Sequence, residues 1–340
     1  MDMEYLTRVA PRTDSTILVA GAGGFIGGWL ATVLYELGFN NVRCVDLQPI
    51  DTWHQVVEGF ENRQADLSER RACREAADGI QQVFNLAADM GGMGFIENNK
   101  ALCMLSVLIN TNLIEATQQA GGERFFFSSS ACVYRDDRQS ESHQPPLVEA
   151  DAYPAMPEDG YGWEKLFSER MVRHFEEDFG LKGRVARYHN VYGPNGTWTG
   201  GREKAPAAIS RKVAAAKLSG NHVIEIWGDG QQTRSFTYID DAVEGTLRLM
   251  WSDVNVPINV GSSEMVTINE LVDITERIAG VSLDREYILD APKGVRGRNS
   301  DNTLIKGVLD WSPETPLAEG MSATYAWVEE QVRLNPEQSE

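Results

Sequence analysis

Short aliphatic and β-branched runs alternate with longer stretches of helical periodicity over the first half of the chain. Apolar runs of this kind are typical of strands buried on both faces, with helices covering both sides of a parallel sheet. Only the first dozen residues and the tail after Asn335 lack such a pattern, and both are predicted to be frayed. The pattern predicts an α/β fold with a doubly wound parallel sheet, with strands at residues 16–20, 42–46, 82–86 and 124–128 and helices at residues 25–37, 99–120 and 161–179.

The regular alternation weakens beyond the strand-like run at residues 183–188, where loops rich in Gly, Pro, Trp and Arg separate shorter elements. We therefore expect a Rossmann-type domain at residues 14–190, to which residues 235–262 return. Residues 191–234 and 263–335 should form a smaller, mixed α/β substrate domain. A cleft between the two parts is expected at the carboxyl ends of the strands.

Composition and net charge disfavour some classes of binding partner. The 340 residues are 42% hydrophobic and 24% charged, which suits one large or two closely packed domains. The net charge of -19 disfavours nucleic acid and anionic membranes as partners. The first residues show no secretory signal and no run of 18 apolar residues occurs, so a cytoplasmic location without a membrane partner is expected. The four cysteines and five histidines are scattered, so neither a metal site nor a disulfide scaffold is predicted.

A glycine-rich segment, residues 21–27, follows the first predicted strand and opens the first predicted helix. Gly21 and Gly24 let the backbone approach a pyrophosphate at the helix N-terminus, and Gly27 allows the helix to pack closely on the strand. Asp46 ends the next strand, where a carboxylate accepts from ribose hydroxyls and favours NAD over NADP. A plain connecting turn is the alternative. The segment predicts NAD as cofactor, held by Gly21, Gly24, Phe25, Ile26, Gly27 and Asp46.

Two further segments are candidate cofactor contacts. Asp66 and Leu67 follow another strand-like stretch and are placed for the adenine edge, although Asp66 could instead cap a helix beginning near Ser68. Ala87 belongs to a run of small residues where a cofactor would lie against the sheet.

Tyr161 and Lys165 are spaced so that they share one face of a helix. An ammonium nearby, together with a cationic nicotinamide, favours the phenolate and makes Tyr161 a candidate base for a sugar hydroxyl. Ser130, upstream, could hold the same hydroxyl. The alternative is a solvated surface pair.

The glycine loop, Ser130, Tyr161 and Lys165 together resemble the extended short-chain dehydrogenase/reductases that act on nucleotide sugars. The resemblance runs from about residue 16 to residue 327 and includes the segments at residues 189–194 and 234–241. The chain departs from the family pattern at two positions: Ala20 replaces a common threonine, and Ser106 stands where an asparagine is usual.

Within that family, the chain is similar to the GDP-mannose 3,5-epimerases at residues 88–95, 196–198, 200–206 and 294–303. In the 4,6-dehydratases, the two positions after the serine resemble Asp-Glu. In this chain the same two positions are Ala131 and Cys132. The resemblance implies that Cys132 and Lys204 form the acid/base pair, with Tyr161, Lys165 and Ser130 assisting oxidation by a bound NAD. It also implies a homodimer through the helices at residues 99–120 and 161–179, and conversion of GDP-mannose to GDP-L-galactose, with GDP-L-gulose as a further product if C3 exchange is incomplete.

The chemistry explains the need for two groups. Oxidation of C4 acidifies the protons on C3 and C5, so each can be removed and returned on the opposite face of the ring. A cysteine can take this role when cations stabilise its thiolate, and Arg202 beside Lys204 is expected to lower the lysine pKa. Alone, Cys132 would be read as an inert buried cysteine and Lys204 as a phosphate ligand.

Several residues are candidates for binding the nucleotide sugar. Arg234, Arg296 and Arg298 could grip the diphosphate, although surface arginines are the plainer interpretation. Met90, Met93 and the glycines between them could form a loop over the sugar, or a simple turn packed on the core. The substrate-binding set inferred from the residues and the resemblance is Gly91, Met93, Ser130, Asn190, Glu203, Lys204, Arg234 and Arg296.

Two other functions remain open from the sequence. A 4-epimerase of another nucleotide sugar would share Tyr161, Lys165 and NAD but would not need Cys132 or Lys204. A non-catalytic dinucleotide sensor could have kept the fold, although the intact tyrosine and lysine argue against it. The nucleobase, the order of the two epimerisations and the direction of each proton transfer are not determined by the sequence.

Overall fold

The computed structural model describes residues 1–291 and 294–338. Its centre is a sheet in which every neighbouring pair of strands is parallel, in the order β11-β6-β5-β4-β1-β2-β3. The order reverses between β1 and β4, so a crevice for a ligand opens at the carboxyl ends of these strands. The strands are β1 (Ile17–Ala20), β2 (Val42–Asp46), β3 (Glu61–Gln64), β4 (Gln82–Asn85), β5 (Arg124–Ser130), β6 (Lys182–Tyr188) and β11 (Ile258–Val260).

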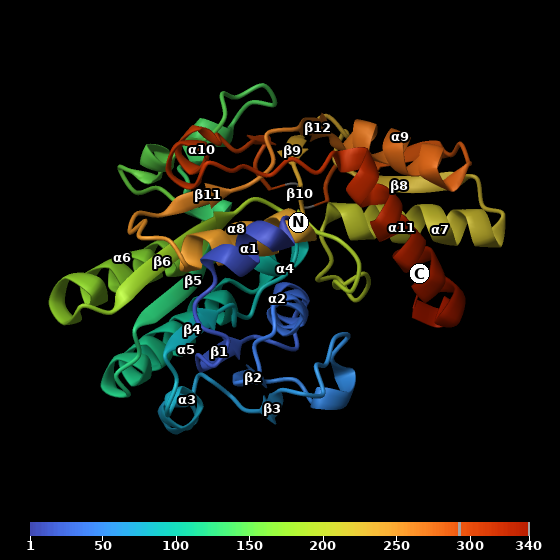
Figure 1. Ribbon diagram of the computed structural model, residues 1–340. Coiled ribbons are helices and arrows are strands. Elements are labelled where there is room, and N and C mark those ends of the chain that lie inside the picture. Colours follow the sequence, from blue (N-terminus) through green and yellow to red (C-terminus); the bar gives the residue numbers. More distant parts are fainter. Residues whose placement is uncertain (292–293, 339–340) are drawn as a thin grey trace.

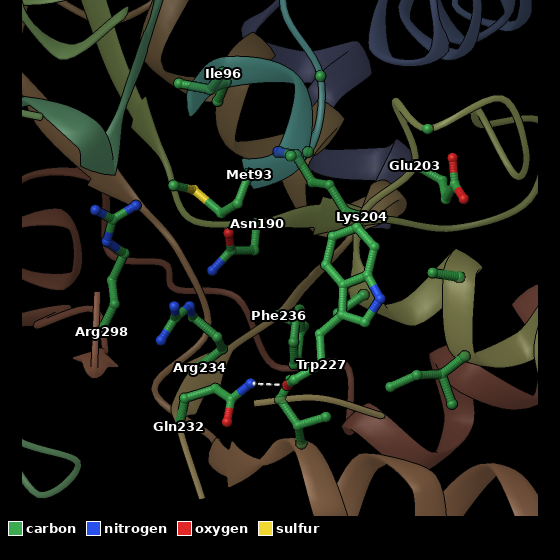
Figure 2. A pocket seen from close by; sticks show the side chains of 18 of the residues that line it. Met93, Ile96, Asn190, Glu203, Lys204, Trp227, Gln232, Arg234, Phe236 and Arg298 are labelled. Atoms are coloured by element: carbon green, nitrogen blue, oxygen red, sulfur yellow. Dashed lines mark hydrogen bonds between the residues drawn. The ribbon is translucent and has the colours of Figure 1, made fainter. Parts of the chain in front are cut away.

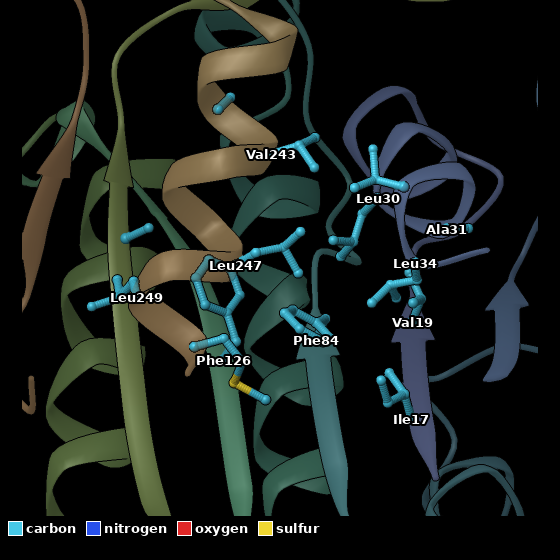
Figure 3. Close-up of a cluster of buried hydrophobic side chains, with 14 of the residues drawn as sticks. Ile17, Val19, Leu30, Ala31, Leu34, Phe84, Phe126, Val243, Leu247 and Leu249 are labelled. Atoms are coloured by element: carbon cyan, nitrogen blue, oxygen red, sulfur yellow. The ribbon is translucent and has the colours of Figure 1, made fainter. Parts of the chain in front are cut away.

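Helices cover both faces of this sheet (Figure 1). On one face, α2 (Phe25–Glu36) and α8 (Ile239–Met250) pack their apolar side chains onto β1, β4 and β5, as Figure 3 shows. The other face is covered by α3 (Arg70–Ala77), α5 (Lys100–Gln119) and α6 (Tyr161–Phe179). Each fully buried aliphatic or phenylalanine side chain contributes about 1.5–3 kcal/mol, so the strand ends are held on a rigid base. The predicted doubly wound α/β fold is confirmed.

A second hydrophobic core lies beyond the sheet, where α7, α9 and α11 pack together (Figure 1). Short strands border it: β8 pairs with β13 in parallel, and β9 pairs with β12 antiparallel and with β14 in parallel. The elements are α7 (Ala205–Ser219), β8 (Val223–Trp227), β9 (Thr233–Ser235), β12 (Met265–Thr267), α9 (Ile268–Ala279), β13 (Asp284–Ile288), β14 (Gly297–Arg298) and α11 (Leu317–Leu334).

The remaining elements are short and connect the two cores. A small parallel pair, β7 (Val191–Tyr192) and β10 (Thr237–Tyr238), joins the segments that cross between them. The other short elements are α1 (Met3–Val9), η1 (Ile50–Thr52), α4 (Met93–Asn98), η2 (Ala131–Val133), η3 (Asp136–Gln139), η4 (Glu149–Ala152), α10 (Thr303–Leu309) and η5 (Pro336–Gln338).

The predicted strands and helices of the first half agree with the structure to within two residues at each end. The prediction of a frayed N-terminus is wrong, because α1 packs on α8. Leu6 is fully buried, the Asp2 N–H donates to the Glu244 carboxylate at 2.9 Å, and the Arg248 guanidinium stacks 3.5 Å from the centre of the Tyr5 ring. One buried leucine in a seven-residue helix leaves too little apolar periodicity to detect. The predicted fraying after Asn335 extends to residues 339–340, which lie outside the described residues.

Candidate functional site

Two cavities open side by side at the carboxyl ends of the strands. The glycine-loop cavity, of about 280 Å³, is lined by Gly21, Gly24, Phe25, Ile26, Gly27 and Lys165 among others. The cysteine cavity, of about 240 Å³, is lined by Cys132 and by side chains from β8, β9 and α7. Six residues line both cavities, so the two cavities adjoin and a molecule in one would lie next to a molecule in the other. The shared residues are Met90, Gly91, Ser130, Tyr161, Tyr188 and Lys204.

The glycine loop fits a dinucleotide because side chains are sterically excluded from it. Gly21 has φ +85°, and a Cβ there would lie 2.8 Å from the Ala87 backbone nitrogen. A Cβ on Gly27 would overlap the Gly21 carbonyl oxygen. The Gly24 position caps α2 without a side-chain bond, so the helix N-terminus faces the cavity with its N–H groups available.

Asp46 lies at the end of β2, where the sequence predicted a ribose contact. Its carboxylate accepts from the Gly23 N–H at 3.0 Å and from the Gln48 N–H at 2.9 Å, which fixes its orientation beside the glycine loop. A phosphate on the ribose would meet this negative charge, so the residues present fit NAD better than NADP.

Asp66, Leu67 and Ala87, the other three predicted cofactor contacts, are, like Asp46, not among the residues that line the glycine-loop cavity. Asp66 accepts from the Ser68 N–H at 2.8 Å, in the turn before α3, and Leu67 is buried in the core under α3. Ala87 backs the Gly21 turn. Their contacts with a cofactor stay predictions.

Tyr161, Lys165 and Ser130 are brought together as the sequence predicted. The Lys165 ammonium lies 5.4 Å from the centre of the Tyr161 ring, and only 3.6 Å separate it from the Glu164 carboxylate. Burial raises the pKa of Tyr161 well above its usual range, while a hydrogen bond with Ser130 acts in the opposite direction. The predicted phenolate therefore needs positive charge beyond that of the protein's own residues.

Cys132 lies in η2, directly after β5, and α6 packs against this turn. A Cβ on Gly162 would overlap the Cys132 carbonyl oxygen, so glycine is required for the first turn of α6 to pass the cysteine. The thiol is 5% exposed and accepts from the Arg298 guanidinium at 3.4 Å. Gln139 orients that guanidinium, accepting from its Nε at 2.6 Å. A cation thus stands against the sulfur, as thiolate chemistry requires.

Lys204 enters the cysteine cavity from the N-cap position of α7, after two glycines with φ of +84° and +80°. Burial lowers the pKa of Lys204, and the Arg298 charge lowers it further, whereas Cys132 acts to raise it. The expectation that Arg202 does this is wrong, because the Arg202 guanidinium pairs with Asp89 at 2.6 Å instead. Arg202, the neighbour in sequence, is held by Asp89, and the guanidinium that lowers the pKa of Lys204 is that of Arg298, on β14.

The remaining wall of the cysteine cavity holds the predicted substrate residues (Figure 2). Arg234 and Arg298 project into it from adjacent strands, and their proximity together with burial lowers the pKa of Arg234. Asn190 has φ +47° and donates to the Ser235 carbonyl at 3.0 Å. Glu203 accepts from Arg211 at 3.0 Å. Gly91 and Met93 also line the cavity.

Arg296 is placed differently from the other predicted substrate residues. Both of its terminal nitrogens donate to Asp229, at 2.8 and 2.9 Å, and it lies outside the lining of both cavities, near Glu141 and His143. Its substrate contact stays a prediction, whereas Arg298 lines the cysteine cavity.

Sequence reasoning missed Trp227 and Lys212. Trp227 is 46% exposed although it lines the cysteine cavity, and the Lys212 ammonium lies 6.0 Å from the centre of its ring. Figure 2 shows the indole across the cavity from Arg234 and Arg298. The available signal was a tryptophan at the end of the alternating run at residues 223–227, followed directly by a glycine.

The part of the chain that the structure describes holds neither a candidate metal cluster nor a candidate membrane-spanning helix. Among residues 1–291 and 294–338, no group of three or more His, Cys, Asp or Glu side chains could hold a metal ion. Within the same ranges, no helix combines the length and apolar character needed to cross a membrane.

A doubly wound sheet with a glycine loop at its switch point, joined to a cavity bearing a tyrosine and a lysine one helical turn apart, defines a dinucleotide-dependent enzyme of the short-chain dehydrogenase/reductase class. The chain belongs to the NAD dependent epimerase/dehydratase family, whose model matches residues 17–261. NAD is accordingly its cofactor.

Relatives and solved structures agree with this assignment. The chain is 46% identical to GDP-mannose 3,5-epimerase of Arabidopsis thaliana over 95% of its own length and 84% of that protein. It is similar in structure to UDP-glucose 4-epimerase of Thermotoga maritima in complex with UDP-glucose, with a TM-score of 0.82 and 26% identity over 93% of this chain and 99% of that one. It also resembles MoeE5 in complex with UDP-glucuronic acid and NAD, with a TM-score of 0.77 and 29% identity over 93% and 100% of the two chains.

Proposed function

We propose that this protein is an isomerase that converts GDP-mannose to GDP-L-galactose, and to GDP-L-gulose when only C5 is inverted. The observation that carries the proposal is the junction of the two cavities. Tyr161 and Lys204 line both, whereas Cys132 lines only the cysteine cavity. A hydride site and two candidate proton-transfer groups therefore surround the same space. The 46% identity to a GDP-mannose 3,5-epimerase supports this substrate over other nucleotide sugars.

The glycine loop, the N-terminus of α2 and Asp46 would hold the cofactor. When bound there, NAD supplies reversible hydride transfer at C4 of the sugar. Ser130 and Tyr161 would hold the C4 hydroxyl, and Tyr161 would take its proton, with Lys165 close to its ring. Once C4 is reduced again, Tyr161 would return that proton to the C4 oxygen.

Cys132 and Lys204 would then act on a ring whose C4 is a ketone. The ketone acidifies the protons on C3 and C5, and inversion requires one group to remove a proton and another to return one from the opposite face. Burial lowers the pKa of Lys204, which raises the fraction of neutral amine able to serve as a base. The Arg298 guanidinium donates to the Cys132 sulfur at 3.4 Å, so it would orient the group that exchanges a proton with the sugar.

The nucleotide would extend from this centre across the cysteine cavity. Arg234 and Arg298 would bind the diphosphate, since guanidinium groups match phosphate oxygens in geometry and charge. Trp227 offers an exposed aromatic face on which a purine base can stack. On this assignment, residues 191–234 and 263–335 bind the nucleotide sugar, and residues 14–190 with residues 235–262 bind NAD.

A homodimer completes the proposal. Apolar side chains on α5 and α6 are exposed although these helices pack side by side; Leu102, Leu105 and Phe167 are 47%, 55% and 55% exposed. A second copy of the chain would cover this face, and sedimentation analysis would report a dimer. A monomer at micromolar concentration would contradict this part. A cytoplasmic location stays a prediction from the sequence.

Deuterium exchange separates the candidate functions. The protein is incubated with GDP-mannose in deuterated water, and the recovered sugar nucleotides are analysed by NMR and mass spectrometry. Deuterium at both C3 and C5 with formation of the L-sugars is the expected result. Inversion at C4 without solvent deuterium would identify a 4-epimerase, and bound NAD without turnover would identify a sensor.

A further inference from the structure

Two segments that border both cavities are joined to one another. The Met-Gly segment (residues 89–95) leaves the carboxyl end of β4, and the lysine segment (residues 200–204) leads into α7. The Gly92 N–H donates to the Arg202 carbonyl at 2.9 Å. A Cβ on Gly92 would lie 2.5 Å from the Glu203 carbonyl oxygen, so the backbones approach as closely as glycine allows. The contact links the sheet side of the site to the α7 side.

The Arg202 side chain reinforces this junction. Its Nη1 donates to the Asp89 carboxylate at 2.6 Å and to the Met90 carbonyl at 3.4 Å. Its guanidinium carbon lies 3.8 Å from the centre of the Phe95 ring, within the range of a cation–π contact. All three partners belong to the Met-Gly segment. The root of that segment is fixed in turn, because the Asp89 N–H donates to the buried Ser106 hydroxyl at 3.0 Å.

The lysine segment has little packing of its own upstream of Arg202. Gly200 and Gly201 have positive φ, and a Cβ built on either would meet no atom within 4 Å. Glycine also has the largest backbone entropy to lose. Lys204 is two residues beyond Arg202, so the position of its ammonium depends on how the segment is held.

We propose that Arg202 is a positioning residue, which ties the lysine segment to the Met-Gly segment and so holds Lys204 at the junction of the two cavities. This inference rests on the proposed function for its activity readout. Misplacing a catalytic group by about 1 Å can cost a factor of 100 in rate. The Arg202–Asp89 ion pair can therefore affect turnover strongly, although an exposed ion pair contributes little to the free energy of unfolding. A plain surface salt bridge would affect neither Lys204 nor turnover.

The test compares Arg202→Gln and Asp89→Asn with Arg71→Gln. The control variant removes a more exposed ion pair on α3, in which Arg71 lies 2.7 Å from Glu75. Amide hydrogen exchange of peptides covering residues 89–95 and 200–204 is measured by mass spectrometry, and C3/C5 deuterium exchange is measured as turnover. We expect Arg202→Gln and Asp89→Asn each to raise amide exchange in both segments and to lower kcat about 10-fold or more, with a smaller change in KM. Arg71→Gln should change neither.

The charge-reversed pair Asp89→Arg with Arg202→Asp provides a second check. It should restore part of the segments' protection and part of kcat relative to either single variant. Because Arg202 also borders the glycine-loop cavity, it could act on a bound molecule directly. Lowered turnover with unchanged amide exchange would establish that direct role and overturn the positioning role. Raised amide exchange with unchanged kcat would also overturn the positioning role, because the segments would be loosened without an effect on turnover. If the wild-type protein itself gives no C3/C5 exchange, the proposed function fails while the amide-exchange comparison still decides whether Arg202 holds the segments.

Discussion

The two cavities are built by different means. One wall of the glycine-loop cavity is backbone from a continuous strand, turn and helix, where side chains are sterically excluded, and the rest of its lining comes from other elements, including β5, α6 and β7. The cysteine cavity is formed by side chains that come from η2, α7, β9 and β14, which are far apart in the chain. The first can bind a common cofactor in many enzymes, whereas the second determines which reaction that cofactor serves.

The largest effect is expected from Gly27→Ala in the glycine-loop cavity. The new methyl group would overlap the Gly21 carbonyl oxygen, so α2 must move away from the loop. We expect loss of bound NAD and of all turnover, with the free energy of unfolding lowered by about 1–3 kcal/mol. NAD retained after purification is measured by absorbance. Gly307→Ala in α10 is the control, because its Cβ meets no atom within 4 Å; equal NAD loss in both variants would contradict the steric explanation.

Lys204→Met tests the proton-transfer role of a residue at the junction of the two cavities. Removing an acid/base group costs about 10²–10⁴-fold in rate, so C3/C5 exchange should fall by this factor while NAD binding stays unchanged. Calorimetric titration with NAD and deuterium incorporation would be measured on the same sample. Lys217→Met, on the last turn of the same helix, should behave as wild type. Loss of NAD binding with Lys204→Met would show that the two cavities are not separable.

Arg298→Gln and Arg296→Gln compare two neighbouring guanidiniums. Hydrogen bonds to a charged group are worth about 1.5–3 kcal/mol, so Arg298→Gln should raise KM for GDP-mannose about 10–100-fold. Arg296 is paired with Asp229 outside both cavities, so its loss should change KM by less. Steady-state kinetics of both variants measure the contrast. A larger KM effect from Arg296 would restore it as the diphosphate residue.

The smallest expected effect is a pH dependence of the free energy of unfolding that comes from Glu158, whose backbone N–H donates to the Cys132 carbonyl. Burial raises the pKa of Glu158 to about 7, and this carboxylate accepts from the Gly162 N–H at 3.0 Å. Because the folded pKa lies above the unfolded value of 4.5, the folded state binds more protons between these values, and stability falls as pH rises through that window. Glu158→Gln should therefore raise the unfolding temperature relative to wild type at pH 8, with the difference vanishing near pH 4. An equal difference at both pH values would contradict the burial of a charged carboxylate.

The contrast between the cavities also explains what sequence reasoning could reach. Gly21, Gly27 and Asp46 follow from local periodicity and steric rules, so the fold and the cofactor were predictable from residues near one another in the chain. The partner of Arg202 and the guanidinium beside Lys204 depend on contacts more than 90 residues apart, between Asp89 and Arg202 and between Lys204 and Arg298. Local sequence carries no information about such contacts. The assignment of Cys132 and Lys204 as a pair therefore came from family resemblance.

The most direct test of the central claim is C3/C5 deuterium exchange by Cys132→Ala, with bound NAD measured in parallel. The account predicts that the variant keeps NAD and loses exchange at both carbons, because the glycine-loop cavity is intact and one of the two proton-transfer groups is gone. Exchange retained at C3 and C5 in that variant would contradict the claim that Cys132 acts on the sugar.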